Sequence, residues 1–266
     1  MSTRIVRFAH EGAPRYGVLD GEDVAVIEPH PFVAYQPTGE RVPVAGLTLL
    51  APVIPSKIVC VGKNYVDHAA EMGGEVPAEP LFFLKPSSSV IGPHEPIRLP
   101  TDLSSEVHHE AELAVVIGAL LQRVSPQEAA SGILGYTCAN DVTARDLQRS
   151  EDQWFRAKGF DSFCPLGPAI ATGLEPGDLA VRCLVDDEVR QDGTTADLVH
   201  DVASLVSQIS QVMTLLPSDV VLTGTPAGVG PLRPGQSVRV EIEGIGALTN
   251  PVIDREVTAG RGNGQP

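Results

Sequence analysis

Two glutamates stand at the start of the most apolar stretch of the chain. Glu110 and Glu112 lie in "EVHHEAELAVVIG" (106–118), directly before a run of residues that is typical of a buried strand. Successive side chains of a strand point to opposite faces, so both carboxylates would lie on one face with Ala114 and Val116. Like charges this close repel each other, and a bound divalent cation would relieve the repulsion. The spacing therefore indicates a metal site.

The alternative is a strand end whose carboxylates face solvent, which is the usual case for an isolated pair of glutamates. Three features favour the metal: the pair enters the apolar run, Asp141 ends another strand-like stretch, "GYTCAN", and no pair of soft ligands competes. Three hard oxygen donors suit magnesium or manganese. His109 would point to the opposite face and pack or support the ligands, and His108 lies one residue pair further out.

A histidine and a glutamate three residues apart form a second candidate site. They are His68 and Glu71, in "GKNYVDHAAEMGG". If "YVDHAAEM" is a helical turn, the two side chains meet on one face, and the carboxylate orients the imidazole as a general base. An exposed short helix with both side chains in solvent is the alternative.

Cationic and polar groups further along the chain are candidates for substrate binding. Arg145 and Lys158 follow Asp141 and could neutralise a substrate carboxylate, or form ordinary surface ion pairs. The glycine-rich stretch "LTGTPAGVG" (222–230) lacks the Lys and Ser/Thr of a phosphate-binding loop, but its amides and the Thr225 hydroxyl could hold an anionic group. Lys85 is a candidate ion-pair partner without an assigned role.

The composition limits the class of protein. A chain of 266 residues with 42% hydrophobic residues can bury a full core, and its net charge of -15 argues against a nucleic-acid partner. The N-terminus lacks the pattern of a signal peptide, and the longest apolar run, "LAVVIGALL", is too short for a membrane span. We therefore expect a cytoplasmic protein that does not contact membranes. The four widely spaced cysteines are expected to be reduced thiols in the core.

The pattern of turns and apolar residues predicts a strand-rich fold in two parts. We expect a small β-rich N-terminal domain over residues 1–52, a catalytic domain over 53–256 and a disordered tail over 257–266. Ser125, Pro126 and Glu128 predict a capped helix start. Apolar residues at helical spacing between 200 and 216 predict one long amphipathic helix that ends before Pro217. Strands are expected at "LAVVIG", "GYTCAN", "DVVLTG" and "SVRVEIEGIG", with a hairpin around 186–187.

Taken in order, these motifs resemble those of the fumarylacetoacetate hydrolase family. The matching stretches cover most of residues 57–230; they are "KIVCVGKNYVDHAAEM", "PLFFLKPSSSVIG", "VHHEAELAVVIG", "GYTCANDVTARDLQ", "RAKGFDSFCPLGP" and "VVLTGTPAGVG". The resemblance implies a mixed, β-rich α+β protein with a β-roll catalytic domain that usually forms a homodimer. It also implies that Glu110, Glu112 and Asp141 hold Mg²⁺ or Mn²⁺, with Ca²⁺ as a further ion that could occupy the site in a crystal.

The resemblance also implies roles for the other candidates. His68 and Glu71 would form the dyad of the acylpyruvate-type branch, on a segment that orders over the substrate. Lys158 and Thr225 would lie in the pocket. The stretch after Arg145, which includes Gln148, is expected to form the far end of the pocket.

The expected substrate is a small 2-oxo acid that chelates the metal through its carboxylate and keto oxygens, so that the ion stabilises an enolate. The dyad favours hydrolysis of a carbon–carbon bond in acylpyruvate-type substrates. Isomerisation or decarboxylation of 2-hydroxyhepta-2,4-diene-1,7-dioate and decarboxylation of oxaloacetate are alternatives that use the same site. A metal-dependent protein that binds small acids without turnover is the competing class, and a scaffold with a structural metal ranks below it.

Overall fold

The computed structural model describes residues 2–255, and strands dominate it as predicted. The tail expected over 257–266 lies outside this range. The largest sheet has 12 strands, in the order β4-β3-β2-β1-β14-β12-β11-β17-β6-β7, with β5 paired to β1 and β8 to β14. These strands are β1 (Thr3–His10), β2 (Ala13–Asp20), β3 (Asp23–Glu28), β4 (Gln36–Pro43), β5 (Thr48–Leu50), β6 (Ile58–Gly62), β7 (Leu81–Lys85), β8 (Val90–Ile91), β11 (Ala111–Ile117), β12 (Ile133–Asn140), β14 (Cys164–Thr172) and β17 (Val220–Leu222).

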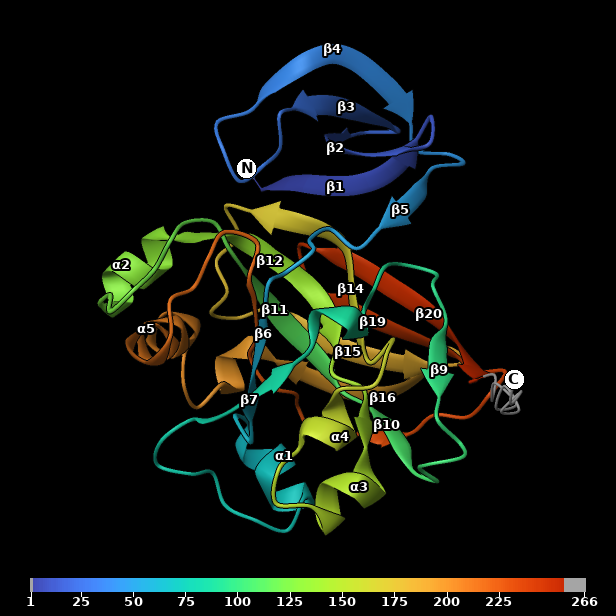
Figure 1. Ribbon diagram of the computed structural model, residues 1–266, viewed down its shortest axis with the longest axis vertical. Helices are drawn as coiled ribbons and strands as arrows, with labels where there is room; N and C mark the ends of the chain where they lie inside the picture. Colours follow the sequence, from blue (N-terminus) through green and yellow to red (C-terminus); the bar gives the residue numbers. More distant parts are fainter. Residues whose placement is uncertain (1, 256–266) are drawn as a thin grey trace, which may run out of the picture.

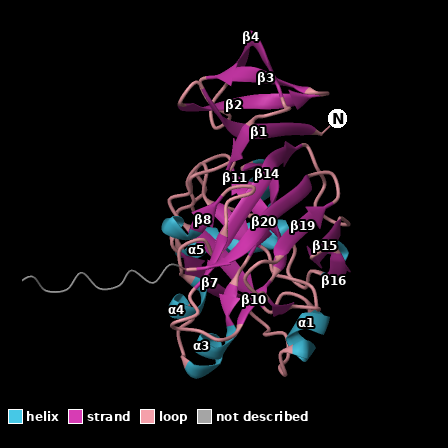
Figure 2. Cartoon of the chain, turned by 90° about the vertical axis from the view of Figure 1, so that its right-hand side faces the viewer, coloured by secondary structure: helices cyan, strands magenta, loops and turns pink. Residues whose placement is uncertain are grey.

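The N-terminal strands continue the sheet of the larger part of the molecule. Strand β1 pairs antiparallel with β14, with Ile5 opposite Ile170. Strands β1 to β5 lie at one end of the molecule, and helices α1 (Val66–Glu71) and α3 (Arg145–Ser150) lie at the other (Figure 1). The N-terminal strands are therefore far from the end that carries the candidate site, as the turned view also shows (Figure 2).

Two smaller sheets complete the strand structure. The five-stranded sheet has the order β16-β15-β19-β20-β9, and the three-stranded sheet has the order β13-β10-β18. Their bounds are β9 (Ile97–Leu99), β10 (Val107–His109), β13 (Thr143–Ala144), β15 (Ala180–Val185), β16 (Glu188–Thr194), β18 (Gly230–Pro231), β19 (Ser237–Ile242) and β20 (Gly246–Asp254). The predicted hairpin joins β15 to β16. Asp186 and Asp187 both have positive φ, 51° and 65°, as a tight two-residue hairpin turn requires.

Helices are short and few in the described part of the chain. They are α1 (Val66–Glu71), α2 (Pro126–Ser131), α3 (Arg145–Ser150), α4 (Phe155–Lys158) and α5 (Val202–Val212), with 3-10 turns at Ser87–Ser89 and Thr195–Asp197. The capping box at the start of α2 is confirmed, because the Ser125 hydroxyl accepts from Glu128 N and Glu128 Oε2 accepts from Ser125 N. None of these helices in residues 2–255 is long and apolar enough to cross a bilayer.

The prediction that the long helix extends to just before Pro217 is wrong at the C-terminal end. Helix α5 ends at Val212, and Met213 has extended backbone, with φ -146° and ψ 149°. Leu215 then forms a β-bridge with Leu121 and is fully buried. The apolar spacing continued past the helix because these residues are buried in an extended segment, which periodicity alone does not distinguish from a helical turn.

Strand β11 lies in the middle of the core, and its two faces pack into different clusters. Leu113, Val115 and Ile117 belong to the largest apolar cluster, while Ala114 and Val116 belong to a second one on the opposite side. The predicted alternation is therefore confirmed. Burial of each leucine, valine or isoleucine side chain in this strand stabilises the fold by about 1.5–3 kcal/mol. The four cysteines are buried and free, as expected.

Candidate active site

The three predicted carboxylates lie together at the ends of neighbouring strands. Glu110 separates β10 from β11, Glu112 is the second residue of β11, and Asp141 directly follows β12. The antiparallel register places Ala111 opposite Asn140, and Asp141 N donates to Glu110 O at 2.9 Å. One oxygen from each carboxylate lies within 4.8 Å of the other two, and all three residues are buried.

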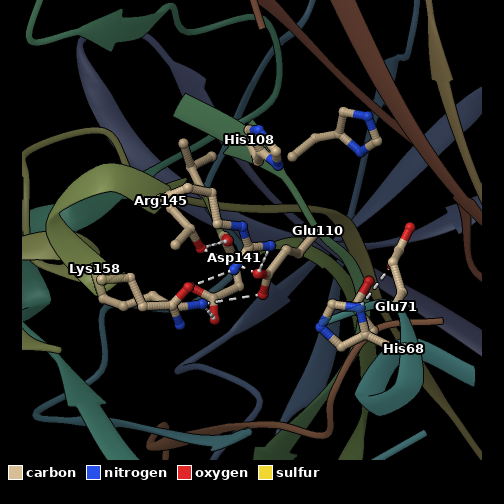
Figure 3. A network of polar contacts seen from close by, with 12 residues as sticks. His68, Glu71, His108, Glu110, Asp141, Arg145 and Lys158 are labelled. Atoms are coloured by element: carbon tan, nitrogen blue, oxygen red, sulfur yellow. Dashed lines mark hydrogen bonds and ion pairs between the residues drawn. The ribbon is translucent and has the colours of Figure 1, made fainter. Parts of the chain in front are cut away.

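Buried cations surround two of these carboxylates (Figure 3). Lys158 Nζ donates to Glu110 Oε2 at 3.0 Å and to Asp141 Oδ2 at 2.6 Å. Arg145 forms an ion pair with the other oxygen of Glu110, and Lys85 Nζ donates to Asp141 Oδ1 at 2.6 Å. These contacts hold the outer oxygens of Glu110 and Asp141 in fixed directions.

Glu112 has a different environment from its two neighbours. It accepts a hydrogen bond from Gly224 N at 2.7 Å, and none of the salt bridges in the described residues includes it. Burial raises the pKa of Glu112 well above its ordinary value, and the charges of Asp141 and Glu110 raise it further. Burial also acts to raise the pKa of Glu110, but the charges of Arg145 and Lys158 outweigh it and lower that pKa.

The donor set fits a divalent metal ion. Two oxygens that share one ion at roughly 2.0–2.6 Å lie at most about 4–5 Å apart, and the 4.8 Å limit of this cluster meets that condition. Within residues 2–255 the Glu112 carboxylate forms no ion pair, and its pKa is raised, so this position favours added positive charge. Glu110, Glu112 and Asp141 could therefore hold a divalent ion, and hard oxygen donors of this kind suit Mg²⁺ or Mn²⁺ better than softer metals.

The histidine–glutamate dyad is formed as the helical spacing predicted. His68 Nδ1 lies 3.1 Å from Glu71 Oε2, and the imidazole is buried. The other oxygen of Glu71 accepts from Gly228 N at 3.1 Å. A carboxylate only accepts, so we assign the His68 proton to Nδ1, which leaves Nε2 as an acceptor. The imidazole lies between Glu71 and Glu110 (Figure 3).

A cavity of about 170 Å³ joins the dyad to the carboxylates. Its lining includes eight predicted side chains, a further arginine and two aromatic residues; these are His68, Glu110, Glu112, Asp141, Arg145, Gln148, Lys158, Thr225, then Arg149, Phe83 and Trp154. Trp154 packs edge-on against Phe83, with ring centroids 5.3 Å apart. Because the chain has one tryptophan, Trp154 fluorescence can report on ligands in this cavity.

Three residues expected to bind substrate are engaged with the protein itself. Arg145 contacts Glu110 and donates to Gln148 Oε1 at 2.7 Å. The Thr225 hydroxyl donates its proton to Ala111 O at 2.8 Å. All three of these predicted side chains still line the cavity. Arg145 and Thr225, however, mainly bind the segment that carries the glutamates, through Glu110 and Ala111 O.

The two histidines beside Glu110 lie outside the carboxylate cluster, as expected. His109 is buried and its Nδ1 lies 3.1 Å from Gln191 Oε1, and burial lowers its pKa to about 4. His108 Nε2 lies 3.3 Å from Glu106. Sequence reasoning left Lys85 without a role and missed Gln191. The pairing of β6 with β7 brings Lys85 to Asp141, and no local spacing signals that pairing.

Comparison with known proteins places the chain in a family. A model described as fumarylacetoacetate (FAA) hydrolase C-terminal matches residues 57–253, and one described as Rv2993c-like, N-terminal matches residues 3–52. Because the first covers well over half of the chain, this protein belongs to the fumarylacetoacetate hydrolase family. The resemblance seen in the sequence motifs is thereby confirmed.

Named relatives carry out different reactions. The human protein named oxaloacetate tautomerase FAHD2A, mitochondrial, is 44% identical over 224 residues, which cover 79% of this chain and 71% of the relative. The structure of 2-hydroxyhepta-2,4-diene-1,7-dioate isomerase from Mycobacterium marinum is 47% identical, covers 96% of this chain and 100% of its own, and has a TM-score of 0.89. Maleylpyruvate hydrolase from Sphingobium sp. SYK-6, in complex with manganese (II) ion and pyruvate, is 32% identical, with coverages of 94% and 99% and a TM-score of 0.77.

Proposed function

We propose that this protein is a divalent-metal-dependent enzyme that moves a proton on an enolisable 2-oxo dicarboxylic acid, and so interconverts its enol and keto forms or its double-bond isomers. The observation that carries the proposal is the position of His68, which Glu71 holds, in the same small cavity as the three buried carboxylates. A proton transfer beside a carbonyl needs these two parts: a base, and positive charge near the oxygen that becomes negative.

The metal contributes one part of this chemistry. When bound by Glu110, Glu112 and Asp141, a divalent ion supplies Lewis-acid stabilisation of the charge that develops on the keto oxygen. The remaining steps depend on side chains of the chain. His68 Nε2 removes a proton from the carbon beside the keto group, the electron pair of that C–H bond forms the new carbon–carbon double bond, and the carbonyl π pair moves to the oxygen. The imidazolium then returns the proton to that oxygen, which gives the enol, or to another carbon of the conjugated chain, which gives the double-bond isomer. Glu71 holds the ring and stabilises the imidazolium that forms.

The size of the cavity supports a small substrate. Pockets for drug-sized ligands are about 300–1,000 Å³, whereas this cavity is about 170 Å³. The names of the more similar relatives agree, since tautomerase and isomerase reactions both move a proton on a short 2-oxo diacid or its enol. Lys158 keeps positive charge beside the reacting oxygen, because the charges of Asp141 and Glu110 outweigh the effect of burial and raise its pKa.

Hydrolysis of an acylpyruvate, which the sequence favoured, is the second candidate. The same dyad could take its proton from a water molecule instead of a carbon, and the hydrolase relative shares the fold at 32% identity. Decarboxylation would use the metal position without requiring the base. The three reactions therefore differ in how strongly they depend on His68.

A panel of substrates with and without chelator separates these reactions. Oxaloacetate enol, the dienedioate named above and an acylpyruvate would be offered to the wild type and to His68→Ala. We expect turnover of enol or dienedioate that is lost with EDTA and in His68→Ala. Cleavage of the acylpyruvate alone would make the protein a hydrolase. Binding of oxalate, seen by Trp154 fluorescence, with no turnover of any substrate would favour a non-catalytic binding protein.

A further inference from the structure

A single buried amide outside the cavity connects both halves of the site. Gln191 lies on β16 of the five-stranded sheet, is 1% exposed, and does not line the cavity. Its Oε1 accepts from Ala111 N at 3.0 Å and lies 3.1 Å from His109 Nδ1. Its Nε2 donates to Thr225 Oγ1 at 2.7 Å and to Pro226 O at 2.8 Å.

These four partners fix the orientation of the amide. Ala111 N is a donor and Pro226 O is an acceptor, so the amide oxygen and nitrogen cannot exchange places. His109 Nδ1 faces the amide oxygen, which only accepts, so His109 donates through Nδ1. Gln191 therefore uses its full hydrogen-bonding capacity to join two segments of chain.

The first of these segments carries the glutamates. Ala111 lies between Glu110 and Glu112 at the start of β11, and its carbonyl oxygen accepts from the Thr225 hydroxyl at 2.8 Å. Gln191, Ala111 and Thr225 thus form a closed set of hydrogen bonds behind the metal position.

The second segment is the loop over residues 223–230, which contacts both catalytic parts through its backbone. Gly224 N donates to Glu112 Oε2 at 2.7 Å, and Gly228 N donates to Glu71 Oε1 at 3.1 Å. Gln191 is bonded to the loop between these two donors, at Thr225 and Pro226. The position of this loop therefore affects a metal ligand and the partner of the catalytic base together.

The loop packs so closely on β16 that only glycine fits at two contact points. A Cβ on Gly228 would lie 2.1 Å from Arg190 O, and one on Gly193 would lie 2.6 Å from Pro226 Cβ. The pairing of β15 with β16 shifts register next to Gln191, and a bulge of this kind re-aims a side chain. This local geometry directs Gln191 from a different sheet toward Ala111 and the 223–230 loop, behind the cavity.

We propose that Gln191 is a positioning residue of the active site, which places Glu112 for the metal and Glu71 for His68 by holding the 223–230 loop. The part that concerns Glu71 rests on the proposed proton-transfer function, and the part that concerns Glu112 does not. Replacing a residue that supports a metal site typically costs about 10–100-fold in metal affinity or activity.

The test uses Gln191→Glu and a matched control in the same sheet. Glutamate keeps the shape and the acceptor of Gln191, but when ionised it donates to neither Thr225 nor Pro226, and when protonated it donates to only one of them. Asn250 on β20 is also buried and donates to Gly92 O at 2.9 Å and Glu95 O at 2.8 Å, outside the cavity lining. Asn250→Asp therefore removes a comparable pair of donated bonds without touching the loop.

Mn²⁺ affinity, measured by the electron paramagnetic resonance signal of free Mn²⁺, needs no turnover. We expect Gln191→Glu to lose roughly 10–100-fold in Mn²⁺ affinity, while Asn250→Asp binds Mn²⁺ as the wild type does, even though both have a lower Tm. Equal Mn²⁺ affinity in the two variants would overturn the proposal. If the wild type turns over none of the offered acids, the proposed function fails but this readout still decides the role of Gln191 at Glu112.

A double-mutant cycle with Glu71→Ala tests the link to the dyad. If Gln191 acts through Glu71, Gln191→Glu should lower kcat by roughly 10–100-fold in the wild type but much less in the Glu71→Ala background, with KM little changed in both. The same loss of kcat in both backgrounds would show that Gln191 does not act through the dyad.

Discussion

Replacing Lys158 with methionine tests how charge is balanced in the carboxylate cluster. The Lys158 ammonium is buried and contacts both Glu110 and Asp141. Methionine fills a similar volume without charge. Removing one partner of a buried ion pair costs about 3–5 kcal/mol, because an uncompensated charge remains.

The expected loss lies at the lower end of that range. Glu110 keeps its ion pair with Arg145 and Asp141 keeps Lys85, so we expect about 3 kcal/mol in chelated protein. In a domain of this size, that loss lowers Tm by roughly 6–12 °C.

A divalent ion should restore much of this stability, since it supplies the positive charge that Lys158→Met lacks. At 100 times its Kd, Mn²⁺ stabilises the wild type by about 2.7 kcal/mol. The same Mn²⁺ concentration should stabilise Lys158→Met by more than that. The measurement is thermal unfolding followed by circular dichroism, in EDTA and over a series of Mn²⁺ concentrations.

Lys57→Met provides the matched control. Lys57 forms an ion pair with Asp219, which is fully buried, and neither residue lines the cavity. This variant should also lose stability, but its gain from Mn²⁺ should equal that of the wild type. If Lys158→Met gains no more from Mn²⁺ than Lys57→Met does, the reasoning about the cluster is refuted.

Three further predictions concern the base His68, the proposed metal ligand Glu112, and the pH dependence that follows from the raised pKa of Glu112. His68→Ala should lower kcat for enol–keto interconversion by roughly 10²–10⁴-fold with Mn²⁺ affinity unchanged, and an unchanged kcat in steady-state assays would remove His68 as the base. Glu112→Gln should abolish Mn²⁺ binding in the resonance assay. The same variant should have a higher Tm than the wild type in EDTA at neutral pH, because Glu112 is buried beside two like charges. A lower Tm in EDTA would contradict this. The raised pKa of Glu112 means that the folded state binds its proton more tightly than the unfolded chain, so the contribution of Glu112 to stability should fall as pH rises above the ordinary value of 4.5. Denaturant titrations of the wild type and Glu112→Gln in EDTA give that contribution as the difference between the two free energies of unfolding. Mn²⁺ affinity should rise over the same pH interval, because the ion displaces the proton. A stability difference and a Mn²⁺ affinity that do not change with pH would contradict these two expectations.

Local spacing was sufficient to predict the parts of the site that neighbouring residues form. Glu110 and Glu112 share a face because a strand alternates its side chains, and His68 meets Glu71 because three residues nearly complete a helical turn. The signal for Asp141 was its place at the end of a second strand-like run.

The parts that sequence reasoning missed depend on which strands pair. Lys85 reaches Asp141 because β7 lies at the edge of the large sheet beside β6. Gln191 reaches the loop over 223–230 from the five-stranded sheet, about 80 residues from the glutamates in sequence. Periodicity within a segment carries no information about such contacts, and it also failed to show that Leu215 is buried in an extended segment.

The most direct test is a crystal structure of the protein soaked with Mn²⁺ and oxalate, with anomalous scattering used to locate the metal. We predict one anomalous peak bonded to an oxygen of each of Glu110, Glu112 and Asp141, with oxalate bound to the same ion on the side that faces His68. Oxalate bound elsewhere, or a cluster of carboxylates without an anomalous peak, would contradict this prediction.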